Sequence, residues 1–120
     1  MSIAYLDGSY MPIEQAKISP MDRGFLFGDG IYEVVPSYAG KMVGFGPHIA
    51  RMQNGLAAVG IKLDWSEDNW AELCNRLINE NGAGNLGIYL HVSRGADSKR
   101  FHAFPDNIAP TVFAYAFEIA

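Results

Sequence analysis

Apolar and polar residues alternate along several short segments of the chain, which is the period of a strand with one buried face. The segments that show this period are residues 2–6, 10–13, 31–38, 42–45, 86–93 and 111–119. Asp7-Gly8 predicts a tight hairpin turn between the first two strands, and residues 39–41 predict a turn between the next two. Pro36 has no amide hydrogen to donate, so it places the third strand at a sheet edge or at a bulge.

Two other segments repeat apolar residues at helical spacing. The first stripe is Ile49, Met52, Leu56 and Val59, and the second is Trp70, Leu73, Cys74, Leu77 and Ile78. Pro47 suits the first position of the earlier helix and Gly60 suits its end, whereas Ser66 and Asn81-Gly82 bound the later helix. Four strands, two helices and two strands predict an α+β fold, a two-layer sandwich with a mainly antiparallel sheet and two helices on one face.

The composition is that of one globular domain over residues 1–120. Nine basic and 13 acidic residues give a net charge of −4, and no basic stripe favours nucleic acid. No apolar run approaches the roughly 18 residues needed to span a bilayer, and the first ten residues lack the basic start of a secretory signal. A single cysteine, Cys74, allows no internal disulfide. We therefore expect a soluble cytoplasmic protein without membrane or nucleic-acid partners.

A glycine-rich segment from Met21 to Glu33 is the first candidate for function. Its glycines allow close approach of a ligand, and Tyr32 follows them with a phenol that can donate a hydrogen bond. The simpler interpretation is a turn that leads to a core tyrosine, and local chemistry alone favours it. Gly28-x-Gly30 precedes a strand rather than a helix, so it is not a phosphate-binding fingerprint by itself.

Two basic clusters are the next candidates. His48 and Arg51 lie three residues apart near the start of a helix, where an arginine and a helix N-terminus both suit a phosphate. A lone helical arginine is usually solvated, however, and His48 is more readily structural than a ligand. Arg94, Arg100 and His102 share one loop, and the last two point to the same side of an extended chain, as a carboxylate trap requires. A plain basic surface loop fits this pattern equally well. Zinc binding is poorly supported, because the histidines and the cysteine show no ligand spacing.

Three motifs recur along the chain in one order. They are Met-Asp-Arg-Gly-Phe…Phe-Gly-Asp-Gly-x-Tyr-Glu-Val at 21–34, His-x-x-Arg-Met at 48–52, and Val-Ser-Arg-Gly…Arg-x-His-x-Phe-Pro at 92–105. Together they resemble the class IV (fold-type IV) pyridoxal-phosphate (PLP) aminotransferases, over nearly the whole chain. The third motif is similar to the D-amino-acid enzymes rather than to the branched-chain amino acid enzymes. Family members often carry an arginine shortly after Tyr-Glu-Val, and the Val35-Pro36-Ser37 found here bears on substrate preference.

The resemblance implies a role for four residues. Arg51 would bind the PLP phosphate, while Tyr32, Arg100 and His102 would hold the α-carboxylate of the substrate. Arg100 and His102 would reach into the site of the neighbouring subunit, because the family enzymes are homodimers. The reaction would transfer an amino group between an amino acid and a 2-oxo acid, with PLP as the electron sink.

The same resemblance assigns no catalytic lysine to this chain. It implies that residues 1–120 are the N-terminal small domain, and that the Schiff-base lysine lies in a C-terminal domain absent from the chain. The lysines present are Lys17, Lys41, Lys62 and Lys99, and none matches the catalytic position. The last strand also reaches Ala120 without a polar end, as a cut piece would. We therefore expect the 120-residue chain alone to be inactive.

Two other hypotheses remain open. Aminodeoxychorismate lyase shares the fold and the cofactor, but its aromatic substrate gives no reason to keep the pair Arg100-x-His102. A stand-alone binding or dimerisation module without chemistry is the third interpretation.

Overall fold

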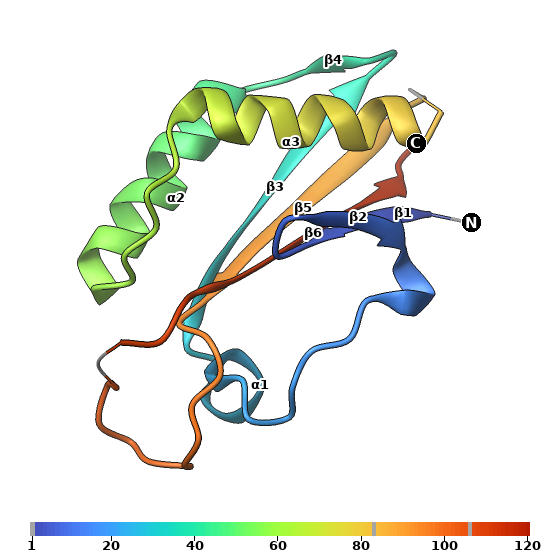
Figure 1. The fold of residues 1–120 in the computed structure, drawn as a ribbon. Coiled ribbons are helices and arrows are strands. Elements are labelled where there is room, and N and C mark those ends of the chain that lie inside the picture. The colour runs from blue at the N-terminus through green and yellow to red at the C-terminus, as the bar shows by residue number, and fades with distance from the viewer. Residues whose placement is uncertain (1, 83, 106) are drawn as a thin grey trace.

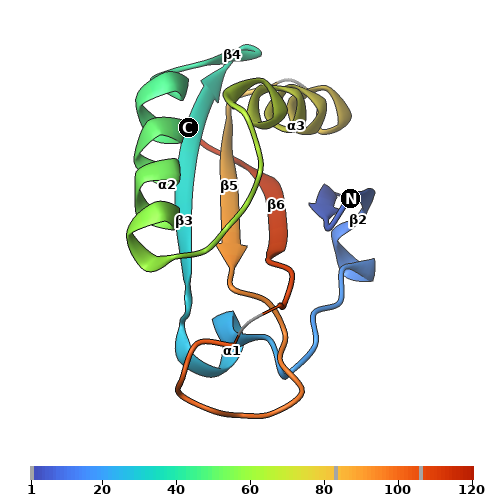
Figure 2. The ribbon, with the colours of Figure 1, turned by 60° about the vertical axis from the view of Figure 1, so that its left-hand side comes forward.

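The computed structural model describes residues 2–82, 84–105 and 107–120. Its main body is a six-stranded sheet in the order β2-β1-β6-β5-β3-β4, and the strand pairs are antiparallel. The strands are β1 (Ile3–Leu6), β2 (Ser9–Pro12), β3 (Gly30–Tyr38), β4 (Lys41–Met42), β5 (Leu86–Ser93) and β6 (Thr111–Glu118). Two longer helices, α2 (Phe45–Val59) and α3 (Glu67–Glu80), cover one face of this sheet (Figures 1 and 2). The predicted α+β two-layer sandwich is therefore confirmed.

Alternation along the strands separates a core face from an outer face. The core face and the two long helices contribute Val35, Ile88, Leu90, Val92, Ala114, Ile49, Met52, Trp70 and Leu77, among other buried residues. The outer face carries a row of aromatic rings that contact one another, formed by Tyr32, Tyr89, Phe113, Tyr115 and Phe117. The helices thus bury one side of the sheet, and the rings partly shield the other.

The turns and caps follow local chemistry. Asp7 and Gly8 adopt φ values of 46° and 98°, the left-handed conformation that the predicted two-residue hairpin requires. Ser66 caps α3 in a capping box with Asn69. Gly60 ends α2 in the left-handed conformation, as predicted.

Two predicted boundaries are wrong. The strand expected over 42–45 stops at Met42, because α2 already begins at Phe45. Pro47 is consequently the third residue of that helix rather than the first, which is tolerated because the first-turn amides have no intrahelical partner.

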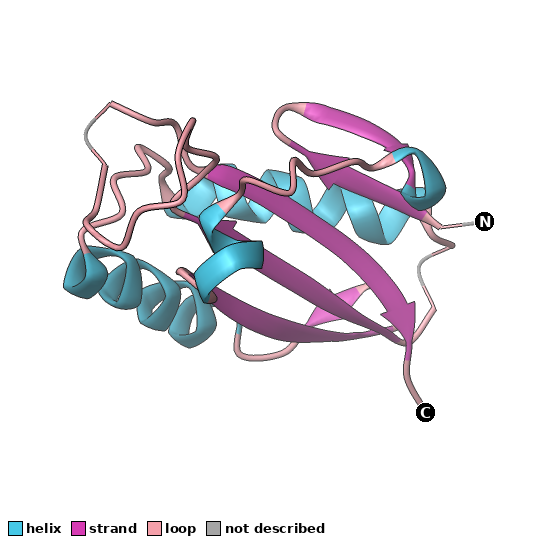
Figure 3. Cartoon of the chain, turned by 90° about the horizontal axis from the view of Figure 1, so that it is seen from below, coloured by secondary structure: helices cyan, strands magenta, loops and turns pink. Residues whose placement is uncertain are grey.

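A short helix, α1 (Arg23–Phe27), lies in the glycine-rich segment, where the sequence analysis predicted no helix. The side chain of Asp22 caps it by accepting from the amide of Gly24, and Gly28 ends it. Five residues are too few to show a helical period, so only the cap residues signalled it. Figure 3 shows α1 on the face of the sheet opposite to the two long helices. A 3-10 turn (Ile13–Gln15) follows β2.

Strand β3 has an open outer edge over most of its length. It pairs with β5 from Gly30 to Ser37, but with β4 only at Ser37 and Tyr38. Pro36 lies next to that short pairing, in agreement with the predicted edge. None of the helices in the described segments is long and apolar enough to cross a membrane.

Candidate functional site

Glu33 joins β3 to α2 at the open edge of the sheet. Its Oε2 accepts from Nε of Arg51 at 2.6 Å, and its Oε1 accepts from Nη2 of Arg51 at 2.7 Å. Oε1 also accepts from Nδ1 of His48 at 2.7 Å. One carboxylate therefore orients both basic side chains of the helix.

The fold explains why this carboxylate needs both partners. Glu33 points to the core face, between Ile31 and Val35, and its side chain is only 4% exposed. A buried carboxylate without a cation would be costly, and the helix presents His48 and Arg51 about one turn apart to meet it. The hydrogen bond from Arg51 lowers the pKa of Glu33, burial opposes that change, and His48 lowers the pKa further. Glu33 is therefore a fixed anion.

Arg51 remains open to an additional anion. Its side chain is 73% exposed, although two of its nitrogens are held by Glu33. The hydrogen bond and charge of Glu33 raise the pKa of Arg51. The expected help from the helix N-terminus is not found, because α2 begins at Phe45 and Arg51 is nearly two turns further on. Arg51 would bind a phosphate through its guanidinium alone.

Tyr32 lies on the outer face of β3, adjacent to Glu33 in sequence. Its ring stacks on Tyr89 with centroids 5.8 Å apart, and the residue is 62% exposed. Tyr32 is therefore an exposed phenol on a firm aromatic support, and not the core tyrosine of the simpler interpretation.

Arg100 and His102 share one support in the loop after β5. The guanidinium of Arg100 lies 5.0 Å from the ring centroid of Phe27, and the His102 ring lies 5.1 Å from the same centroid. Both residues are exposed. Both side chains therefore lie against the same ring. Within the described segments, no hydrogen bond, ion pair or ring contact joins either residue to Tyr32.

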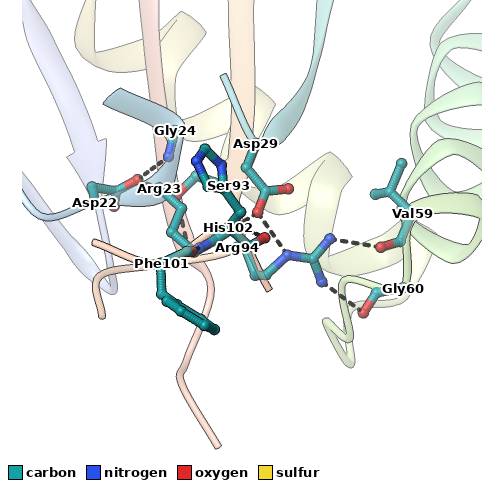
Figure 4. Close-up of polar contacts among 11 residues, drawn as sticks. Asp22, Arg23, Gly24, Asp29, Val59, Gly60, Ser93, Arg94, Phe101 and His102 are labelled. Atoms are coloured by element: carbon teal, nitrogen blue, oxygen red, sulfur yellow. Dashed lines mark hydrogen bonds and ion pairs between the residues drawn. The ribbon is translucent and has the colours of Figure 1, made fainter. Parts of the chain in front are cut away.

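The sequence pattern grouped Arg94 with Arg100 and His102, but the structure separates them. Its side chain is 8% exposed, and its Nε donates to Oδ2 of Asp29 at 2.7 Å. Its other nitrogens donate to the carbonyls of Val59 and Gly60 at the end of α2 (Figure 4). Arg94 is therefore a buried side chain that links the end of β5 to the end of α2 by hydrogen bonds.

Asp29 holds a second buried arginine at the same oxygen. Nε of Arg23 donates to Asp29 Oδ2 at 2.9 Å, and the Arg23 side chain is only 3% exposed. Burial tends to raise the pKa of Asp29, but the hydrogen bonds and charges of Arg94 and Arg23 outweigh it and lower the pKa. One ionised carboxylate thus joins two buried guanidinium groups.

Asp22 organises the start of the same region. Its Oδ1 accepts from the amide of Gly24 at 2.8 Å and from the hydroxyl of Ser93 at 2.6 Å. Its Oδ2 accepts from the hydroxyl of Thr111 at 2.6 Å. Burial lowers the pKa of the neighbouring His91, and the charge of Asp22 partly opposes this effect. The motif residues around α1 therefore serve as a scaffold for the loop that follows β5.

Of the predicted residues, the structure brings Arg100 and His102 together at Phe27, whereas Arg51 pairs with Glu33 and Tyr32 stacks on Tyr89 on the outer face. Glu33, Arg23 and Asp29 were missed as partners. Glu33 left a signal, because a carboxylate on the apolar face of a strand demands a cationic partner. Arg23 and Asp29 left none beyond their place in a glycine-rich motif. In the described part of the chain, no group of three or more His, Cys, Asp or Glu residues could hold a metal ion.

Known proteins are similar to this chain in sequence and in fold. The family model "Amino-transferase class IV" matches residues 30–120. A D-alanine aminotransferase of Staphylococcus epidermidis is 36% identical over 116 residues, which are 96% of this chain and 41% of the relative. The chain thus spans about two fifths of the length of that relative.

Two solved structures share the fold. A branched-chain amino acid aminotransferase from Escherichia coli superposes with a TM-score of 0.90 at 19% identity, covering 98% of this chain and 41% of that one. A 4-amino-4-deoxychorismate lyase from Pseudomonas aeruginosa superposes with a TM-score of 0.74 at 28% identity, covering 96% and 39%. The fold is therefore common to aminotransferases and to a lyase.

Proposed function

Because this chain belongs to the amino-transferase class IV family, we propose that it is the N-terminal domain of a PLP-dependent aminotransferase that acts on D-amino acids and 2-oxo acids. The single observation that carries the proposal is the exposed Arg51 guanidinium fixed by Glu33. It lies in a chain 36% identical to a D-alanine aminotransferase.

Arg51 fits the phosphate of PLP in chemistry and in access. A planar guanidinium suits phosphate oxygens. Because Glu33 already fixes the Arg51 side chain, phosphate binding costs less conformational entropy. Glu33 is itself an anion, so it keeps Arg51 charged while its own oxygens are taken up by three hydrogen bonds. When bound, PLP would supply the electron sink for the reaction.

Tyr32, Arg100 and His102 would hold the substrate α-carboxylate. Tyr32 offers a hydroxyl donor, while Arg100 and His102 offer nitrogen donors from one side of their loop. In this proposal the loop serves the neighbouring subunit of a homodimer rather than the site of its own chain. Such a pairing would complete each carboxylate site from two chains.

The lysine that links PLP covalently would come from outside residues 1–120. All four lysines of this chain are exposed, namely Lys17, Lys41, Lys62 and Lys99. A nucleophilic lysine requires a depressed pKa, usually through burial or a neighbouring cation, and exposure supports none of these candidates. We place the enzyme in the cytoplasm, in keeping with its single buried thiol.

A lyase that acts on aminodeoxychorismate is the alternative, because one such enzyme shares the fold at 28% identity. The presence of Arg100 and His102 favours the aminotransferase, since a pair of nitrogen donors suits a simple α-carboxylate.

The test compares substrates on the full-length enzyme loaded with PLP. We expect D-alanine to convert bound PLP to its amino form, followed spectroscopically, with 2-oxoglutarate reversing the change. Turnover of aminodeoxychorismate without any response to D-alanine would reject the aminotransferase in favour of the lyase. Borohydride reduction and peptide mapping of residues 1–120 incubated with PLP should reveal no stoichiometric lysine adduct. An adduct on one lysine would contradict the proposed position of the catalytic lysine.

A further inference from the structure

We propose that Arg23, braced by Asp29 and acting with Phe27, is a positioning residue that fixes the loop carrying Arg100 and His102. The inference rests on the proposed function, because the position of the loop matters for substrate binding only if those two residues bind the substrate carboxylate. Arg23 and Asp29 do not touch substrate in this scheme. They set where the two ligands of the carboxylate lie.

The backbone of the loop is held by the Arg23 guanidinium. Nη1 of Arg23 donates to the carbonyl of Phe101, and Nη2 donates to the carbonyl of His102 at 3.2 Å. These two peptide groups lie at the Arg100-x-His102 pair. Arg23 is buried, whereas the loop is exposed. A buried side chain therefore fixes the backbone of a loop that has little packing of its own.

The side chains of the pair are held by Phe27, at the other end of α1. Its ring lies 4.7 Å from the Arg23 guanidinium and also contacts Arg100 and His102, as described above. The helix therefore positions the loop twice, through the backbone by Arg23 and through side-chain stacking by Phe27. Cation–π contacts of this kind add modestly to each fixed orientation.

Asp29 connects the Arg23 side chain, which holds the loop, to the helix that carries Arg51. Its Oδ2 receives Arg23 and Arg94 together, and Arg94 binds the last carbonyls of α2 at Val59 and Gly60 (Figure 4). The ring centroid of Phe104 lies 3.8 Å from the Arg94 guanidinium and 5.8 Å from that of Arg23. This ring contact places the loop against both buried arginines. The loop and the phosphate-binding helix are thus fixed to one buried carboxylate.

This arrangement predicts a specific division of effects. Loss of the Arg23 grip should weaken binding of both substrates, because the amino acid and the 2-oxo acid each present an α-carboxylate to the loop. PLP affinity should not change, because Glu33 holds Arg51 independently of the loop. A residue that served only global stability would lower the melting temperature without separating KM from PLP affinity.

The test uses four variants of the full-length, PLP-loaded enzyme, Arg23→Gln, Arg23→Lys, Phe27→Leu and Arg100→Ala. Arg76→Gln is the control, because Arg76 is an exposed arginine whose guanidinium stacks on Tyr10 at 3.8 Å. We expect Arg23→Gln to raise KM for D-alanine and for 2-oxoglutarate about tenfold, with an unchanged Kd for PLP. Arg23→Lys should fail to restore KM, because one ammonium cannot match the fork of donors. Phe27→Leu, at a half-buried position, should raise KM even if Arg23→Gln folds poorly.

Hydrogen exchange provides a readout that does not depend on turnover. Amides of residues 98–104 should exchange faster in Arg23→Gln and Phe27→Leu than in the wild type or in Arg76→Gln. A KM that stays at the wild-type value in folded Arg23→Gln and Phe27→Leu, while Arg100→Ala raises it, would overturn the inference and leave the proposed function intact. An Arg100→Ala enzyme with unchanged KM would instead reject the carboxylate site itself.

Discussion

Glu33 and Arg51 meet in a two-point contact in which Nε and Nη2 of the arginine face the two carboxylate oxygens at 2.6 and 2.7 Å. The carboxylate is buried and the arginine is mostly exposed. The rigid partner therefore comes from the core of the sheet, and the accessible partner faces solvent at its edge. This asymmetry suits a guanidinium that must hold its orientation while it binds a second anion.

Substitution of Glu33 by glutamine should weaken PLP binding by about tenfold, because a neutral amide cannot fix both Arg51 nitrogens. Fluorescence titration of the full-length apoenzyme with PLP measures the change. Pyridoxal, which lacks the phosphate, should bind wild type and variant equally. Glu80→Gln, at the exposed end of α3, is the matched control. Equal loss of pyridoxal and PLP affinity would show that Glu33 does not act through the phosphate.

Much of the fold was predictable because periodicity and caps act locally. The hairpin at Asp7-Gly8 and the Ser66 cap were both expected and found. The boundary between β4 and α2 was not, because Phe45 is apolar and suits a strand as well as a helix start. Helix α1 was missed, since tertiary contacts of Asp22 with Ser93 and Thr111 stabilise what local propensity does not.

The sequence nominated only exposed residues of the candidate site. Arg51, Arg100 and His102 were assigned through a motif resemblance, and their side chains are accessible. Arg94 was placed in the wrong group, because a loop arginine that follows a strand gives no sign that it will turn inward to a helix end. Pairs that span more than 60 residues of sequence, such as Asp29 with Arg94, arise from topology and leave no local pattern.

Gly30→Ala should destabilise the protein by about 1–3 kcal/mol, a typical cost of overpacking. A Cβ at Gly30 would lie 2.8 Å from the carbonyl oxygen of Val92 and 3.2 Å from the His91 ring. Gly84→Ala is the control, since no described residue other than its chain neighbours lies within 4 Å of its added Cβ, and its effect should stay within about 0.5 kcal/mol. Urea unfolding monitored by tryptophan fluorescence gives both values. Equal stability of the two variants would contradict the close strand contact.

Cys74 should resist thiol reagents in the folded protein. Its side chain is fully buried in α3, and burial raises the pKa of its thiol from 9.0 to about 12. That rise alone reduces the thiolate fraction near neutral pH about a thousandfold. Ellman's reagent should therefore label Cys74 only when urea unfolds the chain. The urea concentration at half-maximal labelling should equal the urea concentration at the unfolding midpoint. Stoichiometric labelling of native protein at the rate of the urea-unfolded chain would show that α3 does not pack as described.

The Asp29 carboxylate should make stability fall in acid. Its pKa in the folded protein lies below the ordinary 3.8, so the unfolded chain binds the proton first as the pH falls. The contribution of Asp29 is complete above that ordinary value and is lost as the pH falls through the lowered pKa. Urea midpoints measured from about pH 6 down to about pH 2 should therefore decrease in the wild type.

Asp29→Asn should remove part of that dependence while it lowers stability at neutral pH by about 3 kcal/mol, because two buried guanidinium groups lose their shared anion. The variant's midpoints should fall less steeply in acid than those of the wild type. Asp64→Asn, which removes an exposed carboxylate, should keep the wild-type stability at pH 7. If Asp29→Asn were as stable as the wild type at pH 7 and equally sensitive to acid, the carboxylate would not be the ionised link between Arg23 and Arg94. The positioning role assigned to that link would then have no electrostatic basis.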